Sequence, residues 1–461
     1  MTHTSPEARP QRVVILGGGF GGLYTALELE KALTRRPDFE VTLVNRENFF
    51  LFTPMLHEVA ASDLDVTHIV NPLRKLLRRV RFFEGEAGAV DLARRRVSVT
   101  HGSERHPHQL PYDHLVIALG SVTNFFDLPG LEERALTMKT LGDAIELRNR
   151  LIENLEAADF ECSLGNREPL LTVVVAGGGF AGVETIAAIN DFVREAIVFY
   201  PHLSEDLLRM VLVHPGPVIL PELGEELGAY AQRKLAARKV EIRVNTKVSG
   251  VSAQSVELSD GSRIPTNTLV WTAGTSGHPL LETLPCPKER GRLSVNEFLE
   301  VPEWPGVWAL GDCALIPDAR TGKSYPPTAQ HALREGTVLA RNVLAAIRGG
   351  PKRPFLFSTI GQLAAIGRRT GVARILGVNF SGFFAWWLWR TIYLGKLPRF
   401  EKKLRVALDW ALDLVFSKDL VQLNTAKSRD RVDMATGWLM KNVPACQRQN
   451  GLNGKRCQIA P

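Results

Sequence analysis

The sequence predicts an α/β fold built on two parallel sheets, because the same local pattern occurs twice along the chain. Residues 12–16 and 171–176 are short apolar runs rich in β-branched residues. Each run is followed at once by a glycine-rich turn and then by helix-forming residues. Strand, glycine turn and helix in this order are typical of the first half of a βαβ unit. The sequence therefore predicts two such units.

Both glycine turns have the spacing G-x-G-x-x-G. The first glycine permits a tight turn, the second lets the backbone approach a pyrophosphate, and the third lets the helix pack closely on the strand. Free N–H groups at the start of the helix then favour the anion. One such turn can be a purely local feature, whereas two in the same context indicate two Rossmann-like dinucleotide-binding domains. The expected phosphate-binding residues are Gly17, Gly19, Phe20, Gly21 and Gly22 in the first unit and Gly177, Gly179, Phe180, Ala181 and Gly182 in the second.

The second strand of each unit should end at a residue that faces the adenosine ribose, where an acid would accept from the 2′-hydroxyl. The expected strand 40–44 ends at Asn45, and the strand 210–213 ends at His214. Asn45 can still bond a ribose hydroxyl. A neutral His214 can accept from a hydroxyl, whereas a protonated one would tolerate a 2′-phosphate. The choice between NADH and NADPH stays open, with NADH preferred.

Three further strand-like segments end in small residues and are expected to return toward the two dinucleotides. Two of them end at Gly120 and Gly274 and resemble the crossover strands of dinucleotide-binding sheets. The third carries a Gly-Asp pair at Asp312. A carboxylate there could hold the ribityl hydroxyls of a flavin dinucleotide, and its alternative role is an N-cap for the following segment.

Composition sets the class of protein. A chain of 461 residues with 45% hydrophobic and 23% charged residues fits two or three globular domains. The polar start of the chain lacks the apolar core of a secretory signal, so we expect the protein on the cytosolic side. The five cysteines form no C-x-x-C pair, which predicts reduced thiols. No metal site is expected, and the group His101, His106 and His108 is interpreted as a polar hairpin loop.

At this point the chain resembles the type II NADH dehydrogenases, which are non-pumping NADH:quinone oxidoreductases with a glutathione-reductase-like flavoprotein fold. The resemblance covers residues 11 to 420. It rests on the glycine turns, on residues 48–60, on the Gly-Asp pair at 311–312, and on Pro-Pro-Thr-Ala-Gln-His-Ala at 326–332, which is similar to the family sequence A-Q-x-A-x-Q. The resemblance implies hydride transfer from NADH to FAD, two electrons passed on to a membrane quinone without proton pumping, and a homodimer.

The resemblance also implies roles for individual residues. Ala329 and Gln330 would lie against the flavin and the quinone entrance, and Arg334 stands where the family has a second Gln. An Arg cannot accept a hydrogen bond as Gln can. Glu184 matches a glutamate near the nicotinamide that is linked to proton transfer, its alternative being compensation of the helix dipole. The implied catalytic residues are Glu184 and Gln330, and two further implied FAD contacts are Arg46 and Ala87.

The expected domain order follows from these motifs. The FAD-binding domain is discontinuous and comprises residues 11–165 and 286–368, and residues 166–285 form the NAD(P)H-binding domain. Residues 369–420 are expected to form membrane-interface helices. The tail 421–461 has no predicted role.

The C-terminal region combines apolar, aromatic and basic residues. Residues 375–394 contain three tryptophans, and after Pro398 an apolar stripe repeats with helical spacing from Leu404 to Phe416. The alternatives for the stripe are a core-packing or dimer helix. Together with the surrounding Lys and Arg, the pattern of 375–416 favours a helix pair lying on an anionic membrane surface. We expect peripheral, monotopic attachment to the cytoplasmic face of a bacterial cell membrane.

Alternative functions stay open, because the net charge is +7 and because other enzymes share this fold. Sulfide:quinone oxidoreductases need a cysteine pair near the flavin, and ferredoxin reductases would not need the tryptophan-rich end. A non-catalytic flavin or nucleotide sensor would not be reduced rapidly by NAD(P)H. Nucleic-acid binding by the basic end would depend strongly on salt, and it is not expected.

Overall fold

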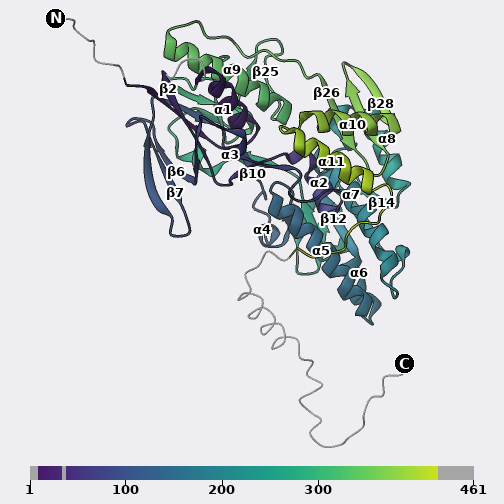
Figure 1. Cartoon of the computed structure of the whole chain (residues 1–461). Coiled ribbons are helices and arrows are strands. Elements are labelled where there is room, and N and C mark those ends of the chain that lie inside the picture. Colours follow the sequence, from purple (N-terminus) through teal and green to yellow (C-terminus); the bar gives the residue numbers. More distant parts are fainter. Residues whose placement is uncertain (1–8, 34–37, 424–461) are drawn as a thin grey trace, which may run out of the picture. The chain divides into compact units, whose positions relative to one another are not determined.

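The computed structural model describes residues 9–33 and 38–423. The chain divides into two units, 1–420 and 421–461, and all that follows concerns the first. Figure 1 shows its helices and strands. The predicted α/β class with two dinucleotide-binding sheets and a C-terminal helical region is confirmed.

The first sheet surrounds the first glycine turn and has five parallel strands in the order β22-β9-β1-β2-β5. The central strand β1 is apolar and buried from Val13 to Leu16, and β9 is buried throughout, as is typical of a parallel sheet covered on both faces. Strand β22 lies far along the chain, beyond the second sheet, so two separate segments build the first sheet. The strands are β1 (Gln11–Leu16), β2 (Phe39–Asn45), β5 (Arg81–Glu84), β9 (His114–Ile117) and β22 (Val307–Ala309).

The second sheet repeats this arrangement around the second glycine turn, with five parallel strands in the order β11-β18-β12-β13-β14. Strand β11 joins this sheet although it lies before residue 166, where the NAD(P)H-binding domain is expected to begin. The strands are β11 (Leu136–Thr137), β12 (Thr172–Ala176), β13 (Arg209–Val213), β14 (Val240–Arg243) and β18 (Thr268–Trp271).

Helices cover both sheets. Helix α1 follows the first glycine turn and packs along α9, while α7 follows the second turn and packs on β12 and β13. The short helix α2 contacts both α5 and α7, and so joins the two halves. The helices of this part are α1 (Phe20–Leu33), α2 (Leu56–Ala60), α3 (Leu73–Leu76), α4 (Leu131–Arg134), α5 (Leu141–Phe160), α6 (Leu164–Leu171), α7 (Phe180–Ala196), α8 (Glu225–Ala236) and α9 (Ala329–Arg348).

Small sheets lie in the connections, and all of their pairings are antiparallel except that of β21 with β23. One of them, β6-β7-β8, carries the three histidines on an exposed hairpin, where the rings of His101 and His108 lie 4.7 Å apart. Within the described residues no group of three or more His, Cys, Asp or Glu side chains could hold a metal ion. The minor strands are β3 (Phe49–Leu51), β4 (Val70–Pro72), β6 (Glu86–Asp91), β7 (Arg96–His101), β8 (His106–Pro111), β10 (Ser121–Thr123), β15 (Val248–Val251), β16 (Ser255–Leu258), β17 (Arg263–Pro265), β19 (Thr275–Gly277), β20 (Lys288–Glu289), β21 (Arg292–Ser294), β23 (Ala314–Leu315), β24 (Pro317–Asp318) and β25 (Lys323–Ser324).

The C-terminal region is only partly helical, unlike the expectation for residues 369–420. A three-stranded antiparallel sheet comes first, and the two helices follow it. The physical reason is a two-residue turn at Leu376 and Gly377, which both have positive φ angles of 50° and 84° and close a β-hairpin. The elements are β26 (Gly361–Ala365), β27 (Gly371–Ile375), β28 (Val378–Gly382), α10 (Phe383–Lys396) and α11 (Phe400–Leu412).

Candidate functional site

A single large cavity runs past both glycine turns and ends beneath α10. Its volume of about 1410 Å³ exceeds the range of roughly 300–1,000 Å³ that is usual for one small ligand. Residues of α1, α7, α9 and α10 line it together. The cavity therefore has room for more than one ligand, and it brings segments from both halves of the unit to one place.

The first glycine turn is shaped as the spacing predicts. Gly17 has a φ of 102°, and a Cβ on Gly22 would lie 1.9 Å from the carbonyl oxygen of Gly17. Gly19, by contrast, has no atom within 4 Å of the position of a Cβ, and it faces the cavity. The turn thus holds the helix tightly against the strand and leaves open space at the N-terminus of α1, where a phosphate would be stabilised.

The second turn is nearly identical. Gly177 has a φ of 117°, and a Cβ on Gly182 would lie 1.8 Å from the carbonyl oxygen of Gly177. Gly179 again has open space and lines the cavity. Two phosphate cradles, one for each of two dinucleotides, therefore open into one cavity.

The residues at the two ribose positions bond first to the glycine turns themselves. Asn45 Oδ1 accepts from the N–H of Gly18 at 2.7 Å, and His214 Nδ1 accepts from the N–H of Gly178 at 3.2 Å. Burial lowers the pKa of His214, which keeps the ring neutral. With Nδ1 occupied as an acceptor, the proton resides on Nε2. Both ring nitrogens are therefore engaged by the backbone, Nδ1 at Gly178 and the other at Val218, and a contact of His214 with a ribose hydroxyl stays a prediction.

Sequence reasoning missed an acid that lies near His214. Glu222 lies in a short 3-10 turn (Pro221–Leu223) and lines the cavity. Its charge acts on His214, so the two side chains are electrostatic neighbours. No spacing rule points to an acid at this distance beyond the strand, so Glu222 could not be predicted from the sequence.

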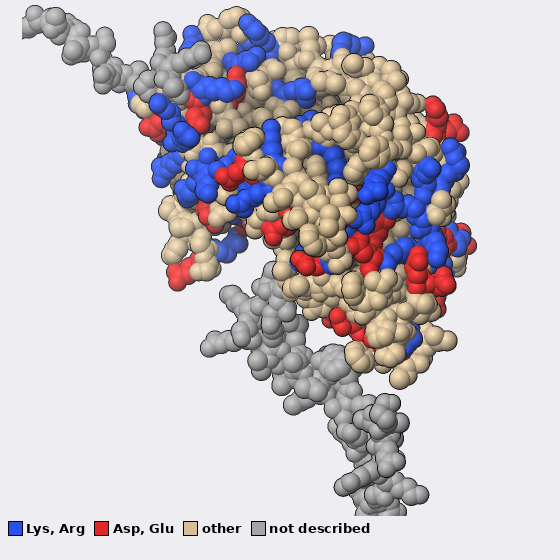
Figure 2. Space-filling model, turned by 45° about the vertical axis from the view of Figure 1, so that its right-hand side comes forward, with Lys and Arg blue, Asp and Glu red and all other residues tan. Residues whose placement is uncertain are grey.

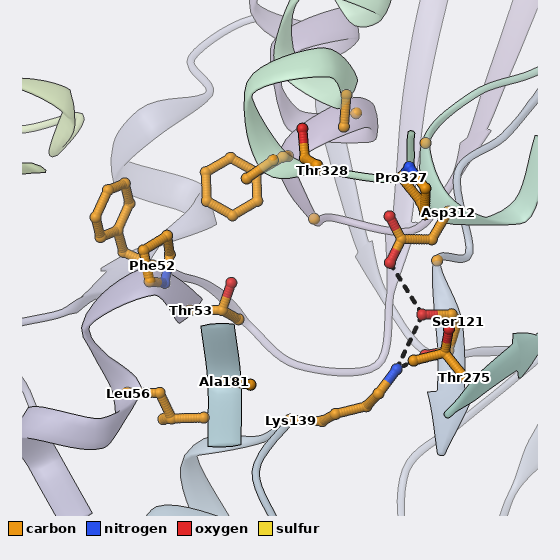
Figure 3. Close-up of a pocket in the computed structure, with 18 of the residues that line it drawn as sticks. Phe52, Thr53, Leu56, Ser121, Lys139, Ala181, Thr275, Asp312, Pro327 and Thr328 are labelled. Carbon is orange, nitrogen blue, oxygen red and sulfur yellow. Dashed lines mark hydrogen bonds between the residues drawn. The ribbon is translucent and has the colours of Figure 1, made fainter. Parts of the chain in front are cut away.

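Asp312 takes part in a hydrogen-bonded chain that Figure 3 shows inside the cavity. Ser121 Oγ donates to Asp312 Oδ2 at 2.9 Å, and Lys139 Nζ donates to Ser121 Oγ at 2.9 Å. The alternative role of Asp312 as an N-cap is wrong, because the cap of the 3-10 turn that contains it is Leu310. Lys139 is a second residue that sequence reasoning missed. Burial lowers the pKa of this amine, although the charges of Asp312 and Asp143 oppose the shift.

The start of α9 forms another wall. Ala329 and Gln330 line the cavity, and Gln330 Nε2 donates to the carbonyl oxygen of Gly361 at 3.2 Å. Arg334 does not line it. Instead its guanidinium lies 4.2 Å from the ring centre of Phe357 and donates to the carbonyl oxygen of Gln330 at 2.8 Å. Arg334 therefore does not take the place of a second cavity-lining Gln.

Glu184 lies on α7 with 8% of its surface exposed, and it also lines the cavity. Its Oε1 accepts from the backbone N–H of Ala365 at 3.1 Å and from Trp389 Nε1 at 3.0 Å. Burial nevertheless raises the pKa of Glu184 to about 8, so this carboxyl holds a proton near neutral pH. The first turn of α7 contains no acid, so the alternative of dipole compensation finds no support.

Most of the expected site residues meet in the cavity. Gly22, Gly177, His214 and Gly274 do not line it; two of these belong to the tight turns, and Gly274 packs against Phe126. The expected residues that do line the cavity are Gly17, Gly19, Phe20, Gly21, Asn45, Arg46, Ala87, Gly120, Gly179, Phe180, Ala181, Gly182, Glu184, Asp312, Ala329 and Gln330. Lining residues without a sequence signal include His57, Ser121, Lys139, Glu222, Gln362, Tyr393 and Lys396.

Cysteine chemistry is poorly supported in this site. Among the described residues Cys162, Cys286 and Cys313 are free, and none of them lines the cavity. Burial raises the pKa of Cys313 to about 11. A thiolate at this position would be strongly disfavoured, which argues against the sulfide-oxidising alternative.

The outer surface of the C-terminal helices is apolar. On α11 the residues Leu404, Leu408 and Leu412 are 62%, 56% and 45% exposed, while Val406 and Trp410 face inward. The stripe therefore points away from the core of this unit, and the core-packing alternative is wrong. Trp387 on α10 is also exposed, but Trp389, expected at the interface, is fully buried. Figure 2 shows Lys and Arg side chains interspersed with broad uncharged areas on this side.

No helix in the described part of the chain has the length and apolar character needed to cross a membrane.

Comparison with family models assigns the two parts of the unit separately. Residues 11–336 match the family described as pyridine nucleotide-disulphide oxidoreductase. Residues 360–419, which include β26 to α11, match the NDH2 C-terminal domain.

Similar proteins agree with this assignment. The chain is 32% identical to a type II NADH:quinone oxidoreductase of Mycobacterium tuberculosis, over 90% of both chains. It is 33% identical to a demethylphylloquinone reductase of Synechocystis, over 88% of this chain and 96% of that one. Among solved structures, NDH2 of Plasmodium falciparum in complex with NADH has the same fold, with a TM-score of 0.82 at 22% identity, over 90% of this chain and all of the other.

Proposed function

Because the chain belongs to the type II NADH:quinone oxidoreductase family, within the pyridine nucleotide-disulphide oxidoreductases, we propose that it oxidises NADH and reduces a membrane quinone. FAD is the bound cofactor. One observation carries this proposal: both phosphate cradles, Glu184 and Gln330 open into one cavity. A donor and an acceptor can therefore reach the same cofactor.

The first half of the cavity fits FAD. The cradle at Gly17 and Gly19 suits the pyrophosphate, and Asp312, held by Ser121, suits the ribityl hydroxyls. When bound, FAD supplies the redox chemistry, accepting a hydride from NADH and passing two electrons to the quinone. We assign residues 11–165 and 286–368 to the domain that holds it, apart from β11, which belongs to the second sheet.

The second cradle suits NADH, and we assign residues 166–285 to this role. The neutral ring of His214 and the carboxylate of Glu222 offer no positive charge to a 2′-phosphate. This arrangement supports NADH over NADPH as the electron donor.

A side chain of the protein can supply the second proton for quinone reduction. Reduction of a quinone to a quinol takes two electrons and two protons, and a hydride from NADH supplies both electrons and one proton. Glu184 is protonated near neutral pH and lies in the cavity wall, so it can donate the second proton. Gln330, at the start of α9, would orient the quinone ring by hydrogen bonding.

A quinone dissolves in the membrane, so we propose that the apolar face of α10 and α11, within residues 375–416, lies on an anionic membrane surface. The attachment is peripheral, on the cytoplasmic face of a bacterial cell, and the protein is a homodimer whose quinone reduction is not coupled to proton pumping. Binding to vesicles of anionic lipid should be lost in Leu408→Glu and kept in Phe160→Glu, a change at an even more exposed apolar residue at the end of α5. Equal vesicle binding by both variants would refute the surface assignment.

The activity is tested with purified protein, NADH and a soluble quinone analogue. We expect NADH consumption that depends on the quinone and that vanishes when FAD is removed. Consumption of NADH at the same rate without any quinone would contradict the proposal.

A further inference from the structure

Helix α2 carries two adjacent titratable side chains that the proposed function does not use. His57 and Glu58 are each only 6% exposed. His57 lines the cavity, and its Nε2 has no hydrogen-bond partner. Glu58 points the other way along the same helix, toward α11, where its Oε2 accepts from Trp410 Nε1 at 3.1 Å. Burying titratable groups costs free energy of folding, so their burial indicates that they have a function.

Two carboxyl groups are thereby held in the same manner, one on α2 and one on α7. Glu184 accepts from the indole of Trp389, and Glu58 accepts from the indole of Trp410. The two indole rings lie 6.3 Å apart. The charge of Glu58 acts on Glu184 directly and contributes to raising the pKa of that residue, although burial is the larger cause. Glu58 is therefore close enough for its charge to influence the proton of Glu184.

His57 lies next to Glu184. Its Nδ1 is 3.9 Å from Glu184 Oε2, and its ring is 5.6 Å from that of Trp389. Burial lowers the pKa of His57 to about 3, so the ring is neutral and supplies no counter-charge to the acid. The neutral ring does not stabilise a carboxylate at Glu184, which favours the protonated form of that residue.

Beyond Glu58 lies a group of buried charges that we call the inner charged cluster: Asp63, Arg390, Asp413 and Lys418. Lys418 Nζ is 2.6 Å from Asp63 Oδ1, and these side chains are only 5% and 15% exposed. The guanidinium of Arg390 lies 4.5 Å from the ring centre of Trp410. The charges of Arg390, Asp63 and Lys418 all act on Glu58. The cluster is thus continuous with Glu58 on its inner side.

The inner charged cluster reaches the surface at its other end. Arg368 NH2 is 3.7 Å from Asp413 Oδ2, and the side chain of Arg368 is 41% exposed. Arg368 also pairs with Glu195 at 3.4 Å. Acidic and basic side chains therefore extend, beneath α10 and α11, from water to the wall of the cavity at Glu184.

We propose that Glu58 carries the solvent proton consumed in quinone reduction, passing it from the inner charged cluster to Glu184. The inference rests on the proposed function. In each turnover a proton from water enters at Asp413 and Asp63, moves to Glu58 and then to Glu184, and becomes the second hydroxyl proton of the quinol. The electrons and the other proton come from NADH, so the reaction balances with no further reactant.

A purely structural role would need only an acceptor for the Trp410 N–H, which an amide oxygen also provides. Burial raises the pKa of Glu58 to about 8, with the charge of Asp63 adding to it and those of Arg390 and Lys418 opposing it. A carboxyl that gains and loses its proton near neutral pH is suited to proton transfer. Glu58→Gln therefore separates the two roles, because it keeps the hydrogen bond and removes the exchangeable proton.

The test uses holo-protein and measures the two half-reactions separately. Reduction of the flavin by NADH needs no proton from solvent, so its rate in Glu58→Gln should equal that of the wild type. Reoxidation by a soluble quinone analogue should be slowed at least about tenfold, with a larger solvent deuterium isotope effect and an altered pH profile. Glu58→Asp should recover part of the rate.

The control is Asp159→Asn. Asp159 is a carboxylate 7% exposed, and its Oδ1 accepts from the backbone N–H of His202, a bond that Asn can keep. It lies on α5, outside the inner charged cluster, so reoxidation should be unchanged. If Glu58→Gln loses its flavin, Asp63→Asn is measured instead and should show the same slow reoxidation.

The outcomes are distinct. Wild-type rates of quinone reduction and an unchanged isotope effect in Glu58→Gln would overturn this inference and leave the proposed function intact. A wild-type protein that NADH reduces but no quinone reoxidises would overturn the proposed function and the inference with it.

Discussion

The indole Nε1 of Trp389 donates a hydrogen bond of 3.0 Å to the carboxyl group of Glu184. Trp389 belongs to α10, whose outer face is apolar, and Glu184 belongs to α7, which starts at the second glycine turn. One hydrogen bond thus links the proposed membrane-facing helix with the proposed nicotinamide site. The C-terminal region is therefore part of the cavity wall as well as the proposed membrane-binding surface.

Replacing Trp389 by Phe should destabilise the protein and disturb Glu184. The change removes a buried donor and leaves one carboxyl oxygen with a single partner, at a cost of roughly 1–3 kcal/mol in the free energy of unfolding. Denaturation of the holo-protein measures this loss. Trp387→Phe on the same helix is the control, because Trp387 is 48% exposed and its loss should have little effect. Equal destabilisation by both changes would contradict the role of the hydrogen bond.

The rate of quinone reduction should fall as pH rises through about 8. The pKa of Glu184 is raised to about 8, so the group is protonated below that pH and becomes an anion above it. Only the protonated form can donate, and activity is therefore highest on the acidic side of this pKa. In Glu184→Gln the rate should be lower, and this pH dependence should disappear. A variant with the wild-type pH profile would show that another group is responsible.

Alanine substitutions at the two matching glycines should separate the two nucleotide sites. A Cβ at Gly22 would lie 1.9 Å from a carbonyl oxygen, and one at Gly182 would lie 1.8 Å from another. Because each clash opens one turn, Gly22→Ala should lose FAD, whereas Gly182→Ala should keep FAD and bind NADH weakly. Flavin absorbance and NADH titration measure the two effects. Loss of FAD in Gly182→Ala would contradict the assignment of the second turn to NADH.

Glu222 should contribute to the preference for NADH. Its carboxylate lies in the cavity wall near His214 and would repel a 2′-phosphate. Glu222→Gln should improve kcat/KM for NADPH by about tenfold, which corresponds to about 1.4 kcal/mol, with a smaller change for NADH. Glu225→Gln changes an exposed acid of the neighbouring helix α8 and should leave the NADPH to NADH ratio as it is. An unaltered ratio in Glu222→Gln would remove this residue from the specificity determinants.

Local signals in the sequence predicted the two sheets and the cradles well. The spacing of Gly17, Gly19 and Gly22 determines the turn almost alone, because each glycine meets a nearby backbone atom or an open space. The same holds for the second turn. Asn45 was also placed correctly at the end of β2, although its bond to Gly18 could not be foreseen from a ribose-binding pattern.

Long-range packing explains what the sequence did not predict. Lys139 reaches Ser121, and Glu58 meets Trp410, across separations that no periodic pattern records. Trp389 was expected on the membrane side because it belongs to a run of tryptophans. It lies two positions after Trp387, roughly 200° around the helix, so it faces inward while Trp387 is exposed. Residues 369–382 were expected to belong to the membrane-interface helices, but they form strands β27 and β28. The turn that joins these strands depends on the φ angles of Leu376 and Gly377.

The central claim is that one cofactor in this cavity takes electrons from NADH and gives them to a quinone. The most direct measurement is anaerobic: NADH is added to the yellow holo-protein until the flavin absorbance is lost, and a ubiquinone or menaquinone analogue is then added. We predict rapid bleaching by NADH, slower bleaching by NADPH, and full return of the absorbance with the quinone. Flavin that NADH fails to bleach, or that stays bleached with every quinone, would contradict the account.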